Sequence, residues 1–465
     1  MVTLPSASRR GLELKPFRGI RYAPERVGDI GAVTSPPYDV IGSGVLGSLL
    51  AESPYNIVRL ILPGPETGGP PGASVAGALA ARRLGEWLGS GALVRDPSPA
   101  IYVYEQNGSS LLQRGLIGLV RVGEPSAAGI FPHEAVMPGP VAGRRSLMRE
   151  TRANLEPIFL VYNGEAGSGG DRGTAGLTAS RLVDQTAERS EPLFEAVTAD
   201  GVTHRLWRIT DPATLSAMAA DLAGRTAMIA DGHHRYAAYR ELREEMRAAG
   251  HAPGPGDYGL AFLVDADSYP PRLGAIHRVI PGLNAKEAAR RAAEAFTVRE
   301  LPDDFGAAMA ALAEAGLAEA GGAEAGGDGG RDGGEDGGRD GGHAFALAGP
   351  EGYWLLTRPD GARLAAVMPA GTSPRWRALD AAVLRELLLA DLWGIEDNER
   401  DVAVSHDASE AVRAAREASG TAVLCNPVPF TAVRDIAADG ECVPRKSTSF
   451  GPKPRTGLVL RTFDD

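Results

Sequence analysis

The sequence predicts a mixed α+β fold, and three stretches support this prediction. Residues 72–89 carry Ala, Leu and Trp at helical spacing, and segments rich in aromatic and β-branched residues follow at 100–106 and 115–122. Residues 225–245 combine a short apolar strand, an Asp-Gly turn and an amphipathic helix. Strand and helix patterns alternate over residues 399–440, which indicates a small C-terminal α/β unit. Helices followed by paired strands favour layered α+β packing over a helical bundle.

Composition limits the class of protein. The 465 residues leave room for two or three domains, and the net charge of -11 argues against a protein that coats nucleic acid. The two cysteines provide no disulfide framework and fit a reducing cytoplasm. The chain shows no apolar run of membrane-spanning length and no signal-peptide pattern. We therefore expect a cytoplasmic protein with a small-molecule substrate and no nucleic-acid or membrane partner. Its oligomeric state is open, with a homodimer as one option.

The spacing of apolar residues and the positions of turn-forming residues predict strands, helices or loops for the other segments. Strands or hairpins are expected at 14–22, 55–63, 157–162, 193–210, 258–266, 276–283 and 344–357. Helices are expected at 141–153, 176–188, 211–223 and 379–394. Residues 163–176 are expected to form a loop, and the Gly-Asp-rich residues 326–342 a flexible insert. These elements divide the chain into an N-terminal mixed α/β part, a core, an Ala/Gly/Asp-rich insert and a C-terminal α/β part, at 1–125, 126–305, 306–343 and 344–465.

The turn between the strand and the helix of residues 225–245 concentrates ionisable groups. Asp231, His233, His234 and Arg235 lie within five residues, with Gly232 among them. The first amides of a helix have no backbone partner, and the helix dipole places partial positive charge there. Imidazole and guanidinium groups would add to that charge. The turn is therefore predicted to bind an anion, above all phosphate, although such residues can also serve only as a helix cap.

A second polar group follows in residues 131–162. His133 and Glu134 are adjacent, but Met137 occupies the position of the second histidine in a His-Glu-x-x-His zinc motif, so that motif is absent. Arg145, Arg149 and Arg152 share one face of the expected helix. This basic stripe either binds a phosphorylated ligand or forms a solvated surface.

Two further segments have alternative interpretations. Tyr38 and Asp39 follow a stiff Pro-Pro pair, and they either project into a cleft or belong to a rigid connector. Lys446, Ser447 and Thr448 end a basic loop that lacks the second glycine of a P-loop. This loop, which also carries Arg445, Lys453 and Arg455, either clamps phosphate oxygens or forms a basic surface turn.

Taken in order, six short segments resemble a known family. They are SPPYDVI, FPHE, TRANLEPIF, IADGHHRY, LDAAVL and PRKSTSF. Together they resemble the family catalogued as domain of unknown function 1015 over residues 15–461. The Asp-Gly-His-His-Arg turn also resembles the turn of ParB-like free serine kinases. The resemblance implies a ParB/serine-kinase-like core with additional strands, and a phosphotransferase that makes phosphoserine with a nucleotide or pyrophosphate.

This resemblance leads to a first hypothesis of a small-molecule phosphotransferase, with Mg²⁺ and either ATP or pyrophosphate as donor. Catalytic roles are expected for Asp231, His233, His234 and Glu134. Phosphate or substrate binding is expected for Gly232, Arg235, His133, Arg145, Arg152, Asn154, Lys446, Ser447, Thr448, Tyr38 and Asp39. The alternatives are a nucleotide-binding regulatory protein without turnover and a metal-dependent hydrolase using His133, Glu134, His233 and His234.

Overall fold

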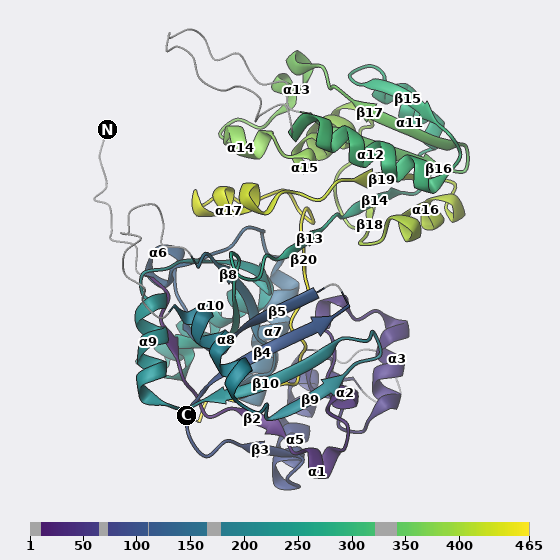
Figure 1. The fold of residues 1–465 in the computed structure, drawn as a ribbon. Helices are drawn as coiled ribbons and strands as arrows, with labels where there is room; N and C mark the ends of the chain where they lie inside the picture. Colours follow the sequence, from purple (N-terminus) through teal and green to yellow (C-terminus); the bar gives the residue numbers. More distant parts are fainter. Residues whose placement is uncertain (1–10, 65–72, 110, 165–177, 321–341, 465) are drawn as a thin grey trace, which may run out of the picture. The chain divides into compact units, whose positions relative to one another are not determined.

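The computed structural model describes residues 11–64, 73–109, 111–164, 178–320 and 342–464. The chain forms two compact units (Figure 1). The first contains residues 1–271 and 452–465, and the second contains residues 272–451. The predicted boundary between residues 125 and 126 differs from this division, because strands from both sides of it pair within one sheet of the first unit. The loop expected at 163–176 and the insert expected at 326–342 lie almost entirely outside the described residues.

The first unit is built on a nine-stranded sheet. Eight of its strands lie in the order β6-β11-β8-β12-β5-β4-β10-β9, and β1 pairs with β5. The pairs β6/β11 and β8/β12 are parallel, and the other pairs are antiparallel. The strands of this unit, with the short pairs β2/β3 and β7/β21, are β1 Leu14–Lys15, β2 Ile20–Tyr22, β3 Leu93–Arg95, β4 Ile101–Gly108, β5 Leu111–Arg121, β6 Ile130–Phe131, β7 Ala153–Asn154, β8 Ile158–Tyr162, β9 Phe194–Val197, β10 Thr203–Ile209, β11 Ala227–Asp231, β12 Tyr258–Asp265 and β21 Arg461–Thr462.

Helices of the first unit pack on this sheet and on one another, with α7 against both α5 and α10. They are α1 Pro24–Val27, α2 Ile30–Val33, the 3-10 turn η1 Tyr38–Val40, α3 Ser43–Glu52, α4 Val58–Ile61, α5 Ala73–Gly89, α6 Pro125–Ala128, α7 Pro138–Thr151, α8 Ala179–Arg189, α9 Pro212–Leu222, α10 His233–Ala248 and the 3-10 turn η2 Pro255–Asp257. Helix α9 begins as predicted, because Asp211 accepts a hydrogen bond of 2.8 Å from Thr214 N and Pro212 occupies its first position.

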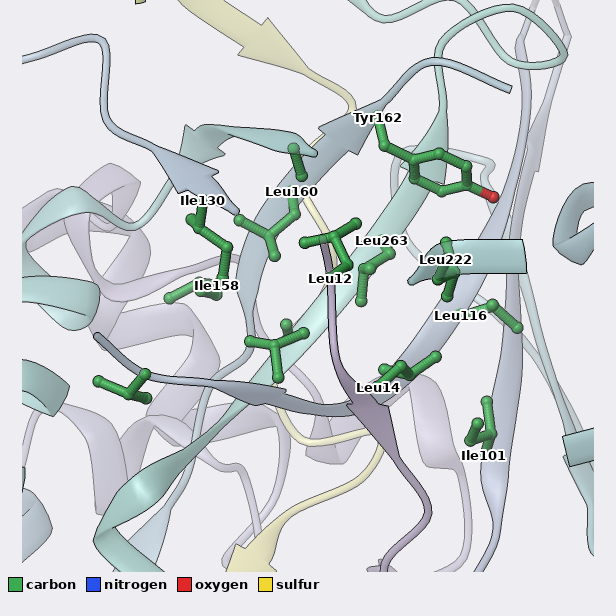
Figure 2. Close-up of a cluster of buried hydrophobic side chains, with 14 of the residues drawn as sticks. Leu12, Leu14, Ile101, Leu116, Ile130, Ile158, Leu160, Tyr162, Leu222 and Leu263 are labelled. Atoms are coloured by element: carbon green, nitrogen blue, oxygen red, sulfur yellow. The ribbon is translucent and has the colours of Figure 1, made fainter. Parts of the chain in front are cut away.

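Buried aliphatic side chains from the sheet form the core that supports β11 (Figure 2). Ile158 and Leu160 of β8 lie in this core with Leu263 of β12 and Leu12 from the N-terminal segment. Each of these side chains is almost fully buried. The continuous apolar sequence of β8 matches its position between β11 and β12, where both faces are covered. The start of β8 is therefore a rigid base for the residues that follow β11.

The second unit contains a six-stranded sheet in the order β15-β17-β16-β19-β14-β18 and a two-stranded pair, β13/β20. Its strands are β13 Arg272–Gly274, β14 His277–Ile280, β15 Thr297–Leu301, β16 Ala344–Gly349, β17 Gly352–Thr357, β18 Ala403–Ser405, β19 Thr421–Cys425 and β20 Ser449–Gly451. Its helices are α11 Ala285–Ala292, α12 Phe305–Ala320, α13 Gly361–Val367, α14 Pro374–Arg377, α15 Asp380–Val383, the π-helix η4 Leu384–Leu392, α16 Ala408–Glu417 and α17 Phe430–Ala438.

The mixed α+β class is confirmed, and three local predictions need correction. Residues 55–63 are not a strand, because residues 58–61 form the short helix α4, and just before it Asn56 Oδ1 accepts a 3.0 Å hydrogen bond from Val58 N. The segment expected as one helix at 379–394 is helical, but only α15 is an α-helix, and the chain continues from it into the π-helix η4. The predicted C-terminal α/β unit is an antiparallel α+β unit, since all pairs of its six-stranded sheet are antiparallel. No helix in the described residues is both long and apolar enough to cross a membrane.

Candidate functional site

The strand, turn and helix predicted within residues 225–245 are present as β11, Gly232 and α10, which together span residues 227–248. Gly232 has a φ of 95°, a left-handed conformation that favours glycine. A Cβ atom at this position would lie only 3.0 Å from Arg235 Nε and 3.1 Å from Ile158 Cγ2. The glycine therefore lets the chain turn directly from β11 into α10 above the start of β8.

Arg235 points into the protein and fixes this turn. Its side chain is 1% exposed. Its Nη1 donates a 2.5 Å hydrogen bond to Pro157 O, and its Nη2 donates to Asp231 Oδ2. The neighbouring carboxylates, with Asp231 first among them, outweigh burial and raise the pKa of Arg235, so the guanidinium stays charged. These contacts favour Arg235 as a support of Asp231, although the sequence suggested a direct phosphate ligand.

Lys453 supplies the second cation at the turn. Its Nζ lies 2.5 Å from Asp231 Oδ1 and 3.3 Å from Asp39 Oδ2. Burial alone would lower the pKa of Lys453, but the carboxylates of Asp231 and Asp39 outweigh burial and raise the pKa. One oxygen of Asp231 therefore faces Lys453, and the other faces Arg235. We call Asp39, Asp231, Arg235 and Lys453 the Lys453 cluster.

Three histidines join the segment before α7 to the start of α10. The rings of His133 and His233 meet edge to face with centroids 4.5 Å apart. His133 N donates to His233 Nε2 at 3.4 Å, and Met137 N donates to His234 Nε2 at 3.1 Å. A ring nitrogen that accepts an N–H bond carries no proton. His233 and His234 therefore hold the 133–137 segment as acceptors through Nε2, whereas the sequence suggested cationic phosphate ligands.

His133 is the most buried of the three histidines. Its Nδ1 lies 2.7 Å from Ile229 O of β11, and the residue is 1% exposed. Burial lowers the pKa of His133 to about 3, with the neighbouring His233 acting in the same direction. His133 is therefore neutral at physiological pH, and it places the partly buried Glu134 beside the start of α10.

Tyr38 joins the same region through Glu156. Tyr38 N donates a 3.1 Å hydrogen bond to Glu156 Oε1, and the Arg144 guanidinium lies 4.1 Å from the centroid of the Tyr38 ring. Glu156 is 4% exposed, and burial raises its pKa although Arg235 and Arg144 act in the opposite direction. Asp39 follows Tyr38 in η1, so this contact anchors one of the carboxylates that face Lys453.

Three other predicted ligands lie in structural contacts. Arg145 Nη1 lies 2.9 Å from Glu241 Oε2 and 3.2 Å from Glu245 Oε1 on α10. Arg152 ends α7 with a φ of 48° and lies 3.6 Å from Asp464. Asn154 Oδ1 accepts hydrogen bonds of 3.3 Å from Leu260 N and 3.1 Å from Arg461 Nη1. Arg145 thus joins α7 to α10 and Arg152 forms a surface pair, which favours the solvated-surface interpretation of the stripe. Asn154 joins β12 to the C-terminal segment.

The loop with Lys446, Ser447 and Thr448 belongs to the second unit. Lys446 has a left-handed φ of 53°, and Ser447 Oγ donates to Pro444 O. Lys446 and Ser447 line a small void together with Arg278, Asp380 and Cys425. A larger pocket of about 410 Å³ shares Asp380 with this void.

Within the first unit, the structure brings together residues 38–39, 133–134 and 231–235, a convergence that the sequence alone left open. Sequence reasoning missed Glu156, and it named Lys453 only as one of several basic residues near the C-terminus. Lys453 lies between Pro452 and Pro454 in a Gly-Pro-Lys-Pro segment, which was the available signal for a fixed lysine. Glu156 had no signal beyond its place next to Pro157 and a buried strand.

The metal-binding capacity of the site is limited. Among the described residues, no group of three or more His, Cys, Asp and Glu side chains is arranged to hold a metal ion. The metal-dependent hydrolase hypothesis therefore lacks a ligand set in this part of the chain. Mg²⁺ requires less from a protein, since it keeps several waters and often binds one or two carboxylates together with substrate phosphates. Asp39, whose side chain is about one-third exposed, fits that smaller requirement, whereas both oxygens of Asp231 already face cations.

The fold and the cluster define a mixed α+β protein with a paired lysine at a strand-to-helix turn. Residues 14–382 match the family described as protein of unknown function (DUF1015), and the chain belongs to that family. No curated protein sequence matches the chain.

Three solved structures are similar at low identity. A free serine kinase in complex with AMP is 13% identical, with a TM-score of 0.31, and the match covers 70% of this chain and 84% of the kinase. SbnI with C-terminal truncation from Staphylococcus aureus is 10% identical, with a TM-score of 0.34 and coverage of 73% and 84%. A conserved hypothetical protein from Pyrococcus furiosus is 14% identical, with a TM-score of 0.30 and coverage of 70% and 87%.

Proposed function

We propose that the chain is a phosphotransferase that moves a phosphoryl group from ATP or pyrophosphate to the hydroxyl of a small alcohol. The observation that carries this proposal is the position of Lys453, whose ammonium lies between Asp39 and Asp231 at the N-terminus of α10. Free L-serine is the first acceptor to test, because the Asp-Gly-His-His-Arg turn resembles that of ParB-like free serine kinases.

The turn can attract phosphate in two ways. The first backbone amides of α10 are oriented as anion donors, and the helix dipole adds positive charge. The Lys453 ammonium has three N–H donors, and the two carboxylates at 2.5 and 3.3 Å account for two of them. Phosphoryl transfer depends mainly on positioning and on neutralising charge on the phosphoryl oxygens. Lys453 and the amides after Gly232 would supply both.

Glu134 is the better candidate for the general base. Both oxygens of Asp231 already face a cation, whereas Glu134 is partly exposed and held beside the turn through His133. Glu134 would take the proton of the acceptor hydroxyl as that oxygen attacks the phosphorus atom of the donor. The leaving group would be ADP or phosphate, with its new charge balanced by Lys453. Asp39 would hold a Mg²⁺ ion that arrives with the donor, and that ion would neutralise phosphate charge.

Other site residues take supporting roles in this proposal. His133, His233 and His234 hold Glu134 next to α10, and Arg235 orients Asp231. Phosphate binding by the loop with Lys446, Ser447 and Thr448 of the second unit is a separate proposal, supported by the basic and hydroxyl-bearing composition of that loop.

The experiment measures phosphoserine formation by purified protein with Mg²⁺, L-serine and either ATP or pyrophosphate. We expect turnover with one of these donors, and a loss of roughly 100-fold or more in Lys453→Met, as found when a group that stabilises transition-state charge is removed. The matched control is Lys286→Met, since Lys286 is exposed in the second unit. If wild-type protein turns over no donor with serine or a panel of small alcohols, the proposal fails.

A second candidate function is nucleotide binding without turnover. The observation in its favour is that both carboxylate oxygens of Asp231 face cations, which suits a rigid phosphate-binding turn. Calorimetric titration with a nucleotide separates the two functions. Binding that disappears in Lys453→Met, with no product after prolonged incubation, would support the regulatory protein and exclude the enzyme.

A further inference from the structure

Glu156 bonds with two segments that are distant in the sequence. Its side chain is buried at the position before Pro157 and β8. A single oxygen, Oε1, accepts a 3.1 Å hydrogen bond from Tyr38 N and a 3.3 Å hydrogen bond from the Thr456 hydroxyl. One buried carboxyl group therefore ties both segments to the same point.

Each tied segment carries a member of the Lys453 cluster. Asp39 follows Tyr38 directly, and Lys453 lies three residues before Thr456. Paired backbone hydrogen bonds of 3.1 and 2.8 Å between Ser35 and Thr456 hold the two segments side by side. The backbone pair aligns the segments with each other, and the Glu156 contacts fix both of them to the end of β8.

The same point in the chain also holds α10. Pro157 O accepts the 2.5 Å hydrogen bond from Arg235 Nη1, and Glu156 O accepts a 3.2 Å hydrogen bond from the Tyr239 hydroxyl. Arg235 in turn binds Asp231. The residues that bring Asp39, Lys453 and Asp231 together are therefore all attached to the two residues that precede β8.

We propose that Glu156 is a positioning residue that sets the distances among Asp39, Lys453 and Asp231. This inference rests on the proposed function, because these three residues are the ones to which that function assigns phosphate, metal or proton handling. Glu156 acts through hydrogen bonds to the two segments and has no role in the transfer itself. Burial raises the pKa of Glu156, and the hydrogen bond from Tyr38 N acts in the opposite direction by favouring the carboxylate.

Substitutions can separate this role from a general effect on folding. Glu156→Gln keeps a side-chain oxygen that accepts from Tyr38 N and Thr456, whereas Glu156→Ala removes it. Thr456→Val removes only the hydroxyl, and it provides a milder test if Glu156→Ala does not fold. Glu241→Ala is the control, because Glu241 is a half-exposed carboxylate of α10 that pairs with Arg145 of α7.

The first measurement is the reactivity of Lys453 and requires no enzymatic turnover. Protein is treated briefly with acetic anhydride at pH 9, and acetylation of Lys453 relative to the exposed Lys286 is quantified by peptide mass spectrometry. In Glu156→Ala and Thr456→Val, Lys453 should lose part of its carboxylate contacts and its pKa should fall. A fall of one unit raises the free-amine fraction, and hence the ratio, about tenfold. Glu156→Gln and Glu241→Ala should keep the wild-type ratio.

The second measurement is the rate of phosphoryl transfer. A misplacement of about 1 Å can cost on the order of 100-fold in rate. We expect kcat to fall by about that factor in Glu156→Ala while KM changes little, with most of the rate restored in Glu156→Gln. If the acetylation of Lys453 relative to Lys286 were unchanged in both Glu156→Ala and Thr456→Val, the inference would be overturned. A changed ratio in a protein that shows no phosphoryl transfer would retain the positioning role and reject the proposed function.

Discussion

Asp231 Oδ1 lies 2.5 Å from Lys453 Nζ, and the other oxygen of the same carboxylate accepts from Arg235. The side chains of Asp231 and Arg235 are 8% and 1% exposed, so water screens this pair only weakly. Asp231 therefore neutralises two cations that belong to different parts of the first unit. Its loss would leave both cations with fewer compensating charges.

Asp231→Asn should destabilise the first unit strongly. Removing one partner of a buried ion pair typically costs about 3–5 kcal/mol, because the other charge stays buried without compensation. The free energy of unfolding, measured by urea denaturation, should fall by roughly that amount. Asp464→Asn is the control, since Asp464 pairs with Arg152 at 3.6 Å on the surface and should change stability by less than about 1 kcal/mol. If both substitutions lowered the free energy of unfolding equally, Asp231 would not be part of a buried ion pair.

Gly232→Ala should be more harmful than an alanine at another left-handed glycine. A left-handed conformation costs a residue with a Cβ atom about 1–2 kcal/mol. At Gly232 the new Cβ would also lie close to Arg235 Nε and Ile158 Cγ2. Gly250 has a φ of 82° and nothing within 4 Å of such a Cβ, so Gly250→Ala measures the backbone cost alone. If urea denaturation gave the two variants equal losses of stability, the predicted steric cost of a Cβ atom at Gly232 would be wrong.

Local patterns predicted the strand, turn and helix around Gly232 because adjacent residues determine that geometry. The Asp-Gly pair, the apolar run before it and the helical spacing after it are all local signals. The failure at residues 55–63 has a different cause. Their apolar, β-branched composition favours a strand, but residues 58–61 form a short helix, and Asn56 donates a 2.8 Å hydrogen bond to the distant Ala32 O.

Charges at the candidate site could be listed from the sequence, but their partners could not. Arg235 and Lys453 are both basic, yet both face Asp231 because the C-terminal segment passes the end of β11. His233 and His234 follow one another and both accept backbone N–H bonds from the segment between His133 and Met137. Pairings of this kind depend on the topology of the sheet, which spacing within one segment does not determine.

Arg145→Ala should have little effect on donor binding. Arg145 is about one-third exposed and pairs with Glu241 and Glu245 on α10. Exposed pairs of this kind contribute roughly 0.2–1 kcal/mol to stability, so the fold should persist. The KM for the donor, or the Kd from calorimetry, should stay within about threefold of wild type, equivalent to roughly 0.7 kcal/mol. A tenfold rise in the KM or Kd for the donor would show that Arg145 leaves its two glutamate partners and binds phosphate.

The buried His133 should make the protein less stable in acid. Its pKa is lowered from 6.5 to about 3 in the folded state, mainly by burial. Between these pH values the unfolded chain binds a proton at His133 and the folded chain does not. The stabilisation from neutral His133 is therefore complete above pH 6.5 and is lost as the pH falls toward 3.

His133→Gln isolates this effect, because glutamine can still donate to Ile229 O but does not titrate. At pH 7 the variant should be less stable than wild type, since it loses the ring contact with His233. Between pH 6 and pH 4 that deficit should shrink by about 1.4 kcal/mol per pH unit, measured from urea denaturation at each pH. The buried His204, whose pKa burial lowers to about 4, titrates in both proteins and cancels in the difference. A deficit that is constant across this range would mean that His133 binds a proton in the folded protein.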